Sequence, residues 1–229
     1  GAAAHYADAF GLPLDRFVWH LGIPRTDLFF DAQARAEAAE AVRKRYALTR
    51  ERRVVLYAPT FRGDRVTEAR HADGLDVALL ARELRTDHVL LLRLHPFVRS
   101  GTRIGPELED FVVDASDHPD INELMLVSDL LVTDYSSAIF EFSLLERPMA
   151  FFAPDLDAYQ QERGFYFDYR AGVPGPVFTE TDALARWIRS GSFDLEQVRR
   201  FRDTSFDVRD GGASRRFVEE VIVPALERD

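Results

Sequence analysis

The chain has 229 residues, of which 46% are hydrophobic, and it carries a formal net charge of −10. This length supports one large α/β domain, or one domain with part of another. The acidic balance argues against general nucleic-acid binding, which needs a concentrated basic surface. The sequence contains no cysteine, which excludes disulfides and thiolate metal sites. Because it shows neither a membrane-spanning run nor a signal peptide, we expect a cytoplasmic chain that neither spans a membrane nor is secreted.

The first strong pattern lies between residues 31 and 63. Residues 31–46 are rich in alanine, glutamate and arginine, which predicts a surface helix. The apolar run VVLYA at 54–58 predicts a buried strand, and a loop with Thr60 and Arg62 follows it. Such a loop can bring a hydroxyl and a positive charge to a ligand, or it can simply face solvent.

Two further strands are predicted, and each is followed by a histidine. After a helix over 75–84, the run HVLLLRL at 88–94 predicts the second strand. Pro96 cannot continue the hydrogen-bond ladder of a sheet, so His95 should lie at the carboxyl end of that strand. A third strand over 111–114 leads into a loop with His118, and Asp120 then opens a helix. Either histidine can be a structural hydrogen-bonding group rather than a functional one.

The segment from 120 to 152 carries the most informative pattern. Residues 129–133 (DLLVT) predict a strand, 136–146 (SSAIFEFSLLE) a helix and 148–152 (PMAFF) another strand, which together make a βαβ unit of a parallel sheet. Asp134, Ser136 and Ser137 form the joint between the first strand and the helix. Open α/β sheets bind ligands beyond the carboxyl ends of their strands, and helix N-termini attract phosphate, so we interpret this joint as a phosphate site. The alternative is that Ser136 is an ordinary N-cap.

The remaining residues complete an α/β pattern. A turn at 174–176 leads to predicted helices over 179–188, 195–201 and 214–222. Asp155 and Asp157 are interpreted as capping or solvated carboxylates, so no metal is assigned. The sequence has no Walker A loop and no G-x-G-x-x-G fingerprint, which disfavours a dinucleotide oxidoreductase. The predicted fold is a Rossmann-like parallel sheet flanked by helices.

Six short motifs occur in order along the chain: G-x-PR-x-D at 22–27, YAPTFR at 57–62, LR-x-H at 92–95, DIN-x-L at 120–124, SD-x-L-x-TDYSS at 128–137 and RGFY-x-D at 163–168. Together they resemble the signature of the CDP-glycerol glycerophosphotransferase family, whose members make teichoic-acid and related capsular polymers. The resemblance covers most of the chain from about Gly22 to Ile188.

The resemblance implies a domain organisation and an activity. Residues 31–229 would form the C-terminal, nucleotide-binding domain of a GT-B-type transferase, and residues 1–30 the end of a junction from a largely missing N-terminal acceptor domain. Such enzymes transfer the polyol phosphate of CDP-glycerol or CDP-ribitol to a hydroxyl of a growing polymer or lipid-linked acceptor, and they release CMP. The full-length protein would lie peripherally at the inner face of the cell membrane.

The resemblance also implies roles for individual residues. Two histidines would stabilise the charge that develops on CMP: His95 and His118. The donor would be bound by Thr60, Arg62, Thr133, Asp134, Ser136, Ser137, Glu141 and Arg163. No cofactor is implied, because CDP-glycerol is a substrate. Two alternatives stay open: a GT-B glycosyltransferase or epimerase that uses a UDP-sugar in the same place, and a non-catalytic nucleotide-binding module.

Overall fold

Two compact units make up the chain in the computed structural model, which describes residues 2–17, 20–63, 74–98, 104–162, 164–165 and 168–227. The first unit combines residues 1–35 with residues 203–229, and the second unit contains residues 36–202. Within the first unit, η2 (Pro24–Phe29) contacts α10 (Ala213–Phe217). The expected junction within residues 1–30 stays a prediction.

One six-stranded parallel sheet runs through the second unit. Its strands are β1 (Arg53–Tyr57), β2 (His88–Leu92), β3 (Val112–Asp114), β4 (Leu130–Thr133), β5 (Met149–Phe152) and β6 (Val177–Phe178). In space their order is β3-β2-β1-β4-β5-β6. Val55 of the central strand β1 stands opposite Leu90 on one side and Leu130 on the other. All five strand pairs are parallel, so the predicted parallel α/β sheet is confirmed.

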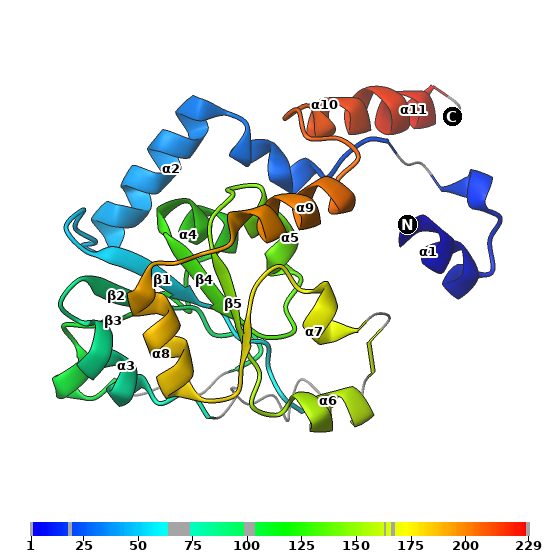
Figure 1. Ribbon diagram of the computed structural model, residues 1–229. Coiled ribbons are helices and arrows are strands. Elements are labelled where there is room, and N and C mark those ends of the chain that lie inside the picture. Colours follow the sequence, from blue (N-terminus) through cyan, green and yellow to red (C-terminus); the bar gives the residue numbers. More distant parts are fainter. Residues whose placement is uncertain are drawn as a thin grey trace. The chain divides into compact units, whose positions relative to one another are not determined.

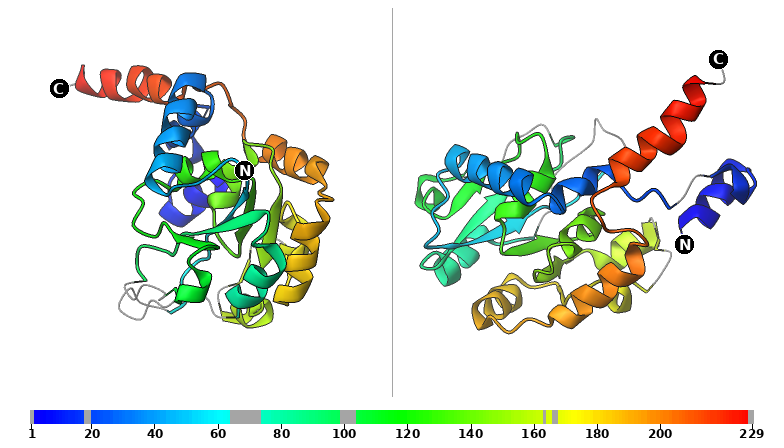
Figure 2. Two further views of the ribbon diagram at one scale, coloured as in Figure 1. Left: turned by 90° about the vertical axis from the view of Figure 1, so that its left-hand side faces the viewer. Right: turned by 90° about the horizontal axis from the view of Figure 1, so that it is seen from above.

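Helices cover both faces of this sheet, as the two views in Figure 2 show. The helices α3 (Val77–Leu84) and α8 (Thr181–Ser190) share one face, where Leu80 and Leu184 join the same buried cluster as Val55 and Val132. The helices α4 (Ile121–Val127) and α5 (Ala138–Ser143) lie on the opposite face (Figure 1). The other helices with residues in this unit are α2 (Ala32–Arg45), α6 (Leu156–Glu162), α7 (Tyr169–Gly172) and α9 (Leu195–Ser205).

Helix α5 is shorter than the predicted helix over 136–146. It ends at Ser143, and Glu146 then adopts a left-handed backbone with φ of 52°. Arg147 precedes a proline, and a residue before proline is sterically disfavoured in the helical region, so the helix cannot continue into β5. The guanidinium of Arg147 instead donates to carbonyl oxygens at the end of α4, at 3.0 Å from Leu126 and 2.6 Å from Ser128. The arginine of this segment therefore caps a neighbouring helix.

The first unit contains short helices from both ends of the chain. They are α1 (Ala2–Phe10), the 3-10 turns η1 (Leu14–Arg16) and η2 (Pro24–Phe29), α10 (Ala213–Phe217), the π-helical turn η5 (Val218–Ile222) and α11 (Val223–Leu226). None of the helices within the described ranges has the length and apolar composition needed to cross a bilayer.

The G-x-PR-x-D motif performs a structural task within this unit. The Asp27 carboxylate accepts hydrogen bonds from the backbone N–H groups of Ala213, at 3.0 Å, and Ser214, at 2.8 Å. Asp27 therefore caps the start of α10, although it lies 186 residues away in sequence. Gly22 has a φ of +80°, and a Cβ added there would lie 3.1 Å from the Cβ of Ala213. Both ends of the motif thus contact the start of α10.

Candidate functional site

The strand order creates one topological switch point, between β1 and β4. From β1 the chain steps outward to β2 and β3 on one side, and from β4 to β5 and β6 on the other. Open α/β sheets bind ligands beyond the carboxyl ends of the strands at such a point. The loop after β1 carries Thr60 and Arg62, and the loop after β4 carries Asp134, Ser136 and Ser137. Five of the predicted site residues therefore follow the two strands that flank the switch point.

Asp134 ties these two loops together. Its Oδ1 accepts hydrogen bonds from the backbone N–H of Thr60, at 2.7 Å, and from the Thr60 hydroxyl, at 2.9 Å. The residue is only 2% exposed, so these bonds are shielded from water. One step earlier, the hydroxyl of Thr133 donates to the carbonyl oxygen of Ala58 at 2.6 Å. We refer to Thr60 together with residues 134–137 as the phosphate seat, after the phosphate site that the sequence predicts at this joint.

Arg62 lies against the phosphate seat, and its guanidinium is bound within the protein. Its Nε and Nη2 donate to the two carboxylate oxygens of Asp155, at 2.6 and 3.1 Å. Nη2 also lies 2.9 Å from Oδ2 of Asp134. Nη1 donates to the carbonyl and hydroxyl oxygens of Thr60, both at 3.0 Å. Each guanidinium nitrogen thus contacts an oxygen of the chain, and the residue is 8% exposed.

Arg62 and Asp155 each stabilise the charged form of the other. Burial disfavours the charged guanidinium, but hydrogen bonds and attraction from Asp155 and Asp134 outweigh it and raise the pKa of Arg62 above its ordinary value. Burial also acts to raise the pKa of Asp155, but Arg62 and the hydroxyl of Tyr135 prevail and lower it. Burial raises the pKa of Asp134, and Arg62 and Thr60 oppose that shift. The arginine and Asp155 are therefore charged at neutral pH.

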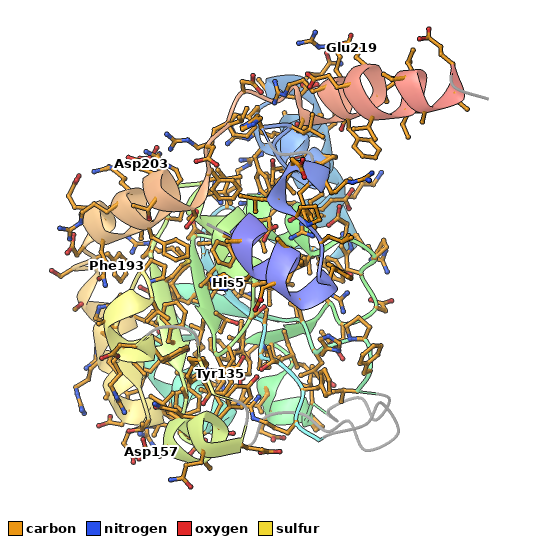
Figure 3. The ribbon with its side chains drawn as sticks, turned by 90° about the vertical axis from the view of Figure 1, so that its right-hand side faces the viewer. His5, Tyr135, Asp157, Phe193, Asp203 and Glu219 are labelled. Carbon is orange, nitrogen blue, oxygen red and sulfur yellow. The ribbon has the colours of Figure 1, made fainter. Side chains whose placement is uncertain are left out.

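Aromatic rings enclose the guanidinium. The centroids of Tyr135 and Tyr159 lie 5.0 and 5.5 Å from its central carbon, and the two rings stack at 3.7 Å. The Tyr135 hydroxyl donates to Asp155 Oδ1 at 2.9 Å. Figure 3 shows Tyr135 beside α6, the helix that carries Asp157. Burial raises the pKa of Tyr135, so its hydroxyl stays protonated and remains a donor at neutral pH.

The two serines of the phosphate seat differ in their environments. The Ser136 hydroxyl accepts a hydrogen bond of 3.2 Å from the backbone N–H of Ala138, so it does part of what an N-cap does. A serine hydroxyl that accepts still has a proton to donate. Ser137 is exposed. The cap interpretation of Ser136 and the phosphate interpretation are therefore compatible.

His95 follows β2, the strand on the far side of β1 from β4. Its Nδ1 accepts a hydrogen bond from the backbone N–H of Phe97 at 3.2 Å, so the neutral ring carries its proton on Nε2. Phe61 and Phe97 contact the imidazole, each with a centroid distance of 4.7 Å. Burial, and to a lesser degree the charge of Arg93, lower the pKa of His95 below its ordinary value of 6.5. At neutral pH the ring is thus a neutral hydrogen-bond donor.

His118 lies elsewhere in the fold. It follows β3, and two strands separate β3 from β4, a distance of about 14 Å at the usual strand spacing. Its Nδ1 pairs with the hydroxyl of Tyr46 at 3.2 Å, and its Nε2 with Glu123 Oε2 at 2.8 Å. The residue is 4% exposed. Both ring nitrogens are therefore engaged in joining the end of α2 to α4.

Comparison with known proteins identifies the family. The family model for CDP-Glycerol:Poly(glycerophosphate) glycerophosphotransferase matches residues 3–223. The chain belongs to this family. A teichoic acid poly(ribitol-phosphate) polymerase of Bacillus spizizenii is 40% identical over 224 residues, which are 97% of this chain and 36% of that protein. A teichoic acid poly(glycerol phosphate) polymerase of Bacillus subtilis is 41% identical over 172 residues, 73% of this chain and 23% of that protein.

The solved structures agree with this assignment. The wall teichoic acid polymerase TagF is similar to this chain with a TM-score of 0.84 and 31% identity, over 99% of this chain and 56% of that chain. The match confirms the predicted fold of a glycerophosphotransferase domain. The chain spans between 23% and 56% of the length of these three relatives. One relative makes a ribitol-phosphate polymer and another a glycerol-phosphate polymer, at nearly the same identity, so identity does not select the polyol.

The remaining predicted site residues of this glycerophosphotransferase family member have mixed environments. Thr133 is fully buried and joins β4 to the end of β1, which makes it part of the framework. Glu141 lies in α5 and is 3% exposed. Arg163 lies outside the described residues. No group of three or more histidine or carboxylate side chains that could hold a metal occurs in the part of the chain that the structure describes.

Sequence reasoning missed the residues that hold Arg62. Asp155, Tyr135 and Tyr159 surround it, and Tyr169 donates from its hydroxyl to the backbone carbonyl of Asp134 at 2.8 Å. The available signal was the carboxylate pair Asp155 and Asp157, and the interpretation of Asp155 as a capping or solvated carboxylate was wrong, because it is paired with Arg62. Because β1, β4 and β5 are adjacent parallel strands, the arginine, carboxylates and tyrosines that follow them could have been expected to lie close together.

A cavity of about 460 Å³ lies at the opposite edge of the sheet. It is lined at the start of β5 by Pro148 and Met149, beside β6 by Pro176, and further along the chain by Trp187 and Phe193. None of the predicted site residues that the structure describes lines it. The volume suits a small molecule, but the amino ends of parallel strands are not where this sheet type binds its ligands.

Proposed function

We propose that this chain is the donor-binding part of a polyol-phosphate transferase. The donor is CDP-glycerol or CDP-ribitol, and the product polymer is of the teichoic-acid or capsular type. The observation that carries the proposal is the phosphate seat at the switch point between β1 and β4, where Asp134 binds the Thr60 loop. The family description supports the donor class, and the ribitol- and glycerol-phosphate polymerases among the relatives support both polyols.

The reaction in this proposal is a phosphoryl transfer. The acceptor hydroxyl oxygen attacks the phosphorus atom that carries the polyol, and a new O–P bond forms. The bond between this phosphorus and the bridging oxygen breaks, and its electron pair leaves with CMP. The hydroxyl proton passes to a base on the acceptor side. Such transfers depend on positioning and on neutralising the charge of the leaving group.

The phosphate seat and His95 divide these tasks. The hydroxyls of Ser136 and Ser137 donate hydrogen bonds to the pyrophosphate, and Thr60 bounds the site from the β1 side. His95 offers Nε2–H to the departing phosphate as a neutral donor, because its lowered pKa leaves it uncharged at neutral pH. The acceptor is a polymer end or a lipid-linked hydroxyl. In this proposal, the parts of such polymerases that this chain does not span bind the acceptor and attach the protein peripherally to the inner face of the membrane.

Calorimetric titration tests the donor assignment. We expect this chain to bind CDP and CDP-glycerol or CDP-ribitol with micromolar affinity. UDP and UDP-sugars should bind at least about tenfold more weakly, a difference of ~1.4 kcal/mol in binding free energy. Ser136→Ala should weaken CDP binding, and Ser205→Ala, the same change at an exposed position in α9, should not. A preference for a UDP-sugar would favour the glycosyltransferase or epimerase alternative. Absence of binding to any of these nucleotides would contradict the proposal.

A further inference from the structure

We propose that Asp155 is a positioning residue of the phosphate seat, which it orients through Arg62. The inference rests on the proposed function, because the seat must bind the donor for its orientation to matter. Asp155 follows β5, the strand next to β4, and lies just before helix α6. It therefore links a third strand end to the two that flank the switch point.

The link from Asp155 to Arg62 is a two-point contact. One carboxylate oxygen accepts from Nε at 2.6 Å and the other from Nη2 at 3.1 Å. A forked arginine–carboxylate pair fixes the plane of the guanidinium as well as its position. Tyr135 donates to the same carboxylate at 2.9 Å, so the carboxylate is held from a second direction.

The link from Arg62 to the phosphate seat is equally direct. Nη1 holds the carbonyl and hydroxyl oxygens of Thr60 at 3.0 Å, and Nη2 lies 2.9 Å from Asp134. Asp134 in turn accepts from the backbone N–H groups of Thr60 and Tyr135, both at 2.7 Å. A shift of the guanidinium would therefore move both loops of the seat.

Arg62 does not have the environment of a phosphate-binding arginine. Its nitrogens contact Asp155, Asp134 and Thr60, and two tyrosine rings lie near its central carbon. Its side chain is 10% exposed, whereas that of Asp155 is 38% exposed. A donor phosphate could reach the fork of this arginine only by displacing Asp155. The geometry instead gives Arg62 the task of holding the seat in shape.

The two possible roles of Asp155 predict opposite signs. If it positions the seat, removing its charge lets the guanidinium shift and weakens the binding of a diphosphate. If it competes with a donor phosphate for Arg62, removing its charge strengthens that binding. Asp157 provides a matched control, because it is an exposed carboxylate two residues away in the same segment.

The experiment compares CDP and CMP binding to the wild-type chain, Asp155→Asn and Asp157→Asn by calorimetry, with melting temperatures measured in parallel. We expect Asp155→Asn to weaken CDP binding about tenfold, the effect of one lost charge-assisted hydrogen bond, and CMP binding less than about threefold. Asp157→Asn should match the wild type for both nucleotides. Tyr135→Phe removes only the hydroxyl on Asp155 and should shift the CDP-to-CMP ratio in the same direction, which keeps the test available if Asp155→Asn fails to fold.

Four results would overturn the inference. Unchanged CDP binding by Asp155→Asn would mean that the carboxylate does not orient the phosphate seat. Tighter CDP binding would mean that it competes with a donor phosphate for Arg62. An equal loss for CDP and CMP would mean a purely structural role. A wild-type chain that binds no CDP would remove the proposed function itself, and the inference with it; that outcome is distinguishable because it appears without any substitution.

Discussion

Asp134 and Asp27 both belong to family-like motifs, yet they perform different tasks. Asp134 is buried at the switch point and binds Arg62 and Thr60. Asp27 is half-buried in the first unit and caps helix α10 through two backbone N–H groups. The first carboxylate belongs to an ionic cluster at the proposed ligand site, and the second satisfies a helix end. The partners of a motif residue, and not its membership in the motif, therefore decide whether it serves the proposed ligand site or the stability of the fold.

Asp134→Ala should have the largest effect on stability. Removing one partner of a buried ion pair leaves a buried charge poorly compensated, and among the described residues Arg62 would retain Asp155 as its anionic partner. We expect the free energy of unfolding to fall by about 3 kcal/mol and CDP binding to be lost. Urea denaturation and calorimetry measure the two effects. Asp157→Ala, at an exposed carboxylate, should change neither, and an Asp134→Ala variant as stable as the wild type would contradict the buried-pair account.

Asp27→Ala should separate folding from binding. The loss of a helix N-cap typically costs about 1 kcal/mol, so we expect a destabilisation of that size. Because the cap lies in the first unit and the phosphate seat in the second, CDP affinity should stay within about twofold of the wild type. Asp8→Ala, an exposed aspartate in α1, serves as the control. A large loss of CDP affinity in Asp27→Ala would break the proposed division of tasks.

The cap should also depend on pH. Burial acts to raise the pKa of Asp27, but hydrogen bonds from Ser214 and Ala213 and the charge of Arg216 prevail and lower it below its ordinary value of 3.8. The cap therefore stabilises the fold fully above pH 3.8 and loses its contribution as pH falls through the lowered pKa. Stability curves of the wild type and Asp27→Ala should run parallel above that pH and converge below it.

Substitution of His95 should produce the smallest change in stability. On acidification His95 gains a positive charge, whereas Asp27 loses a negative one. Its pKa lies below the ordinary 6.5, so as pH falls below 6.5 the unfolded chain takes up the proton first and the free energy of unfolding decreases. This part of the pH dependence should be absent in His95→Gln, and it amounts to a few tenths of a kcal/mol in the free energy of unfolding, about the size of a typical surface effect. An unchanged slope in His95→Gln would contradict a lowered pKa.

Five of the six strands could be predicted because they are short runs of consecutive apolar residues, which are typical of a parallel sheet covered on both faces. The sixth strand, β6, has only two residues and was not predicted. The ends of the other five differ from prediction by one or two residues, as at β2, which stops at Leu92. Helix α5 was predicted too long because its end depends on Glu146, whose left-handed backbone no periodicity reveals.

The proximity of the Thr60 loop and the Asp134 loop was predictable for the same reason. Parallel strands bring their carboxyl ends to one edge, which is enough to associate Thr60 with Ser136. The partners of Arg62 were not predictable in this way, since Asp155 lies 93 residues from it in sequence. The environment of His118 likewise depends on Tyr46, which lies 72 residues away in another element.

The most direct test of the account is a crystal structure of this chain with CDP. We expect the diphosphate within hydrogen-bonding distance of Ser136 and Ser137, at the switch point between β1 and β4, with the Arg62–Asp155 pair intact. A diphosphate bound instead in the cavity beside Trp187, at the other edge of the sheet, would contradict it.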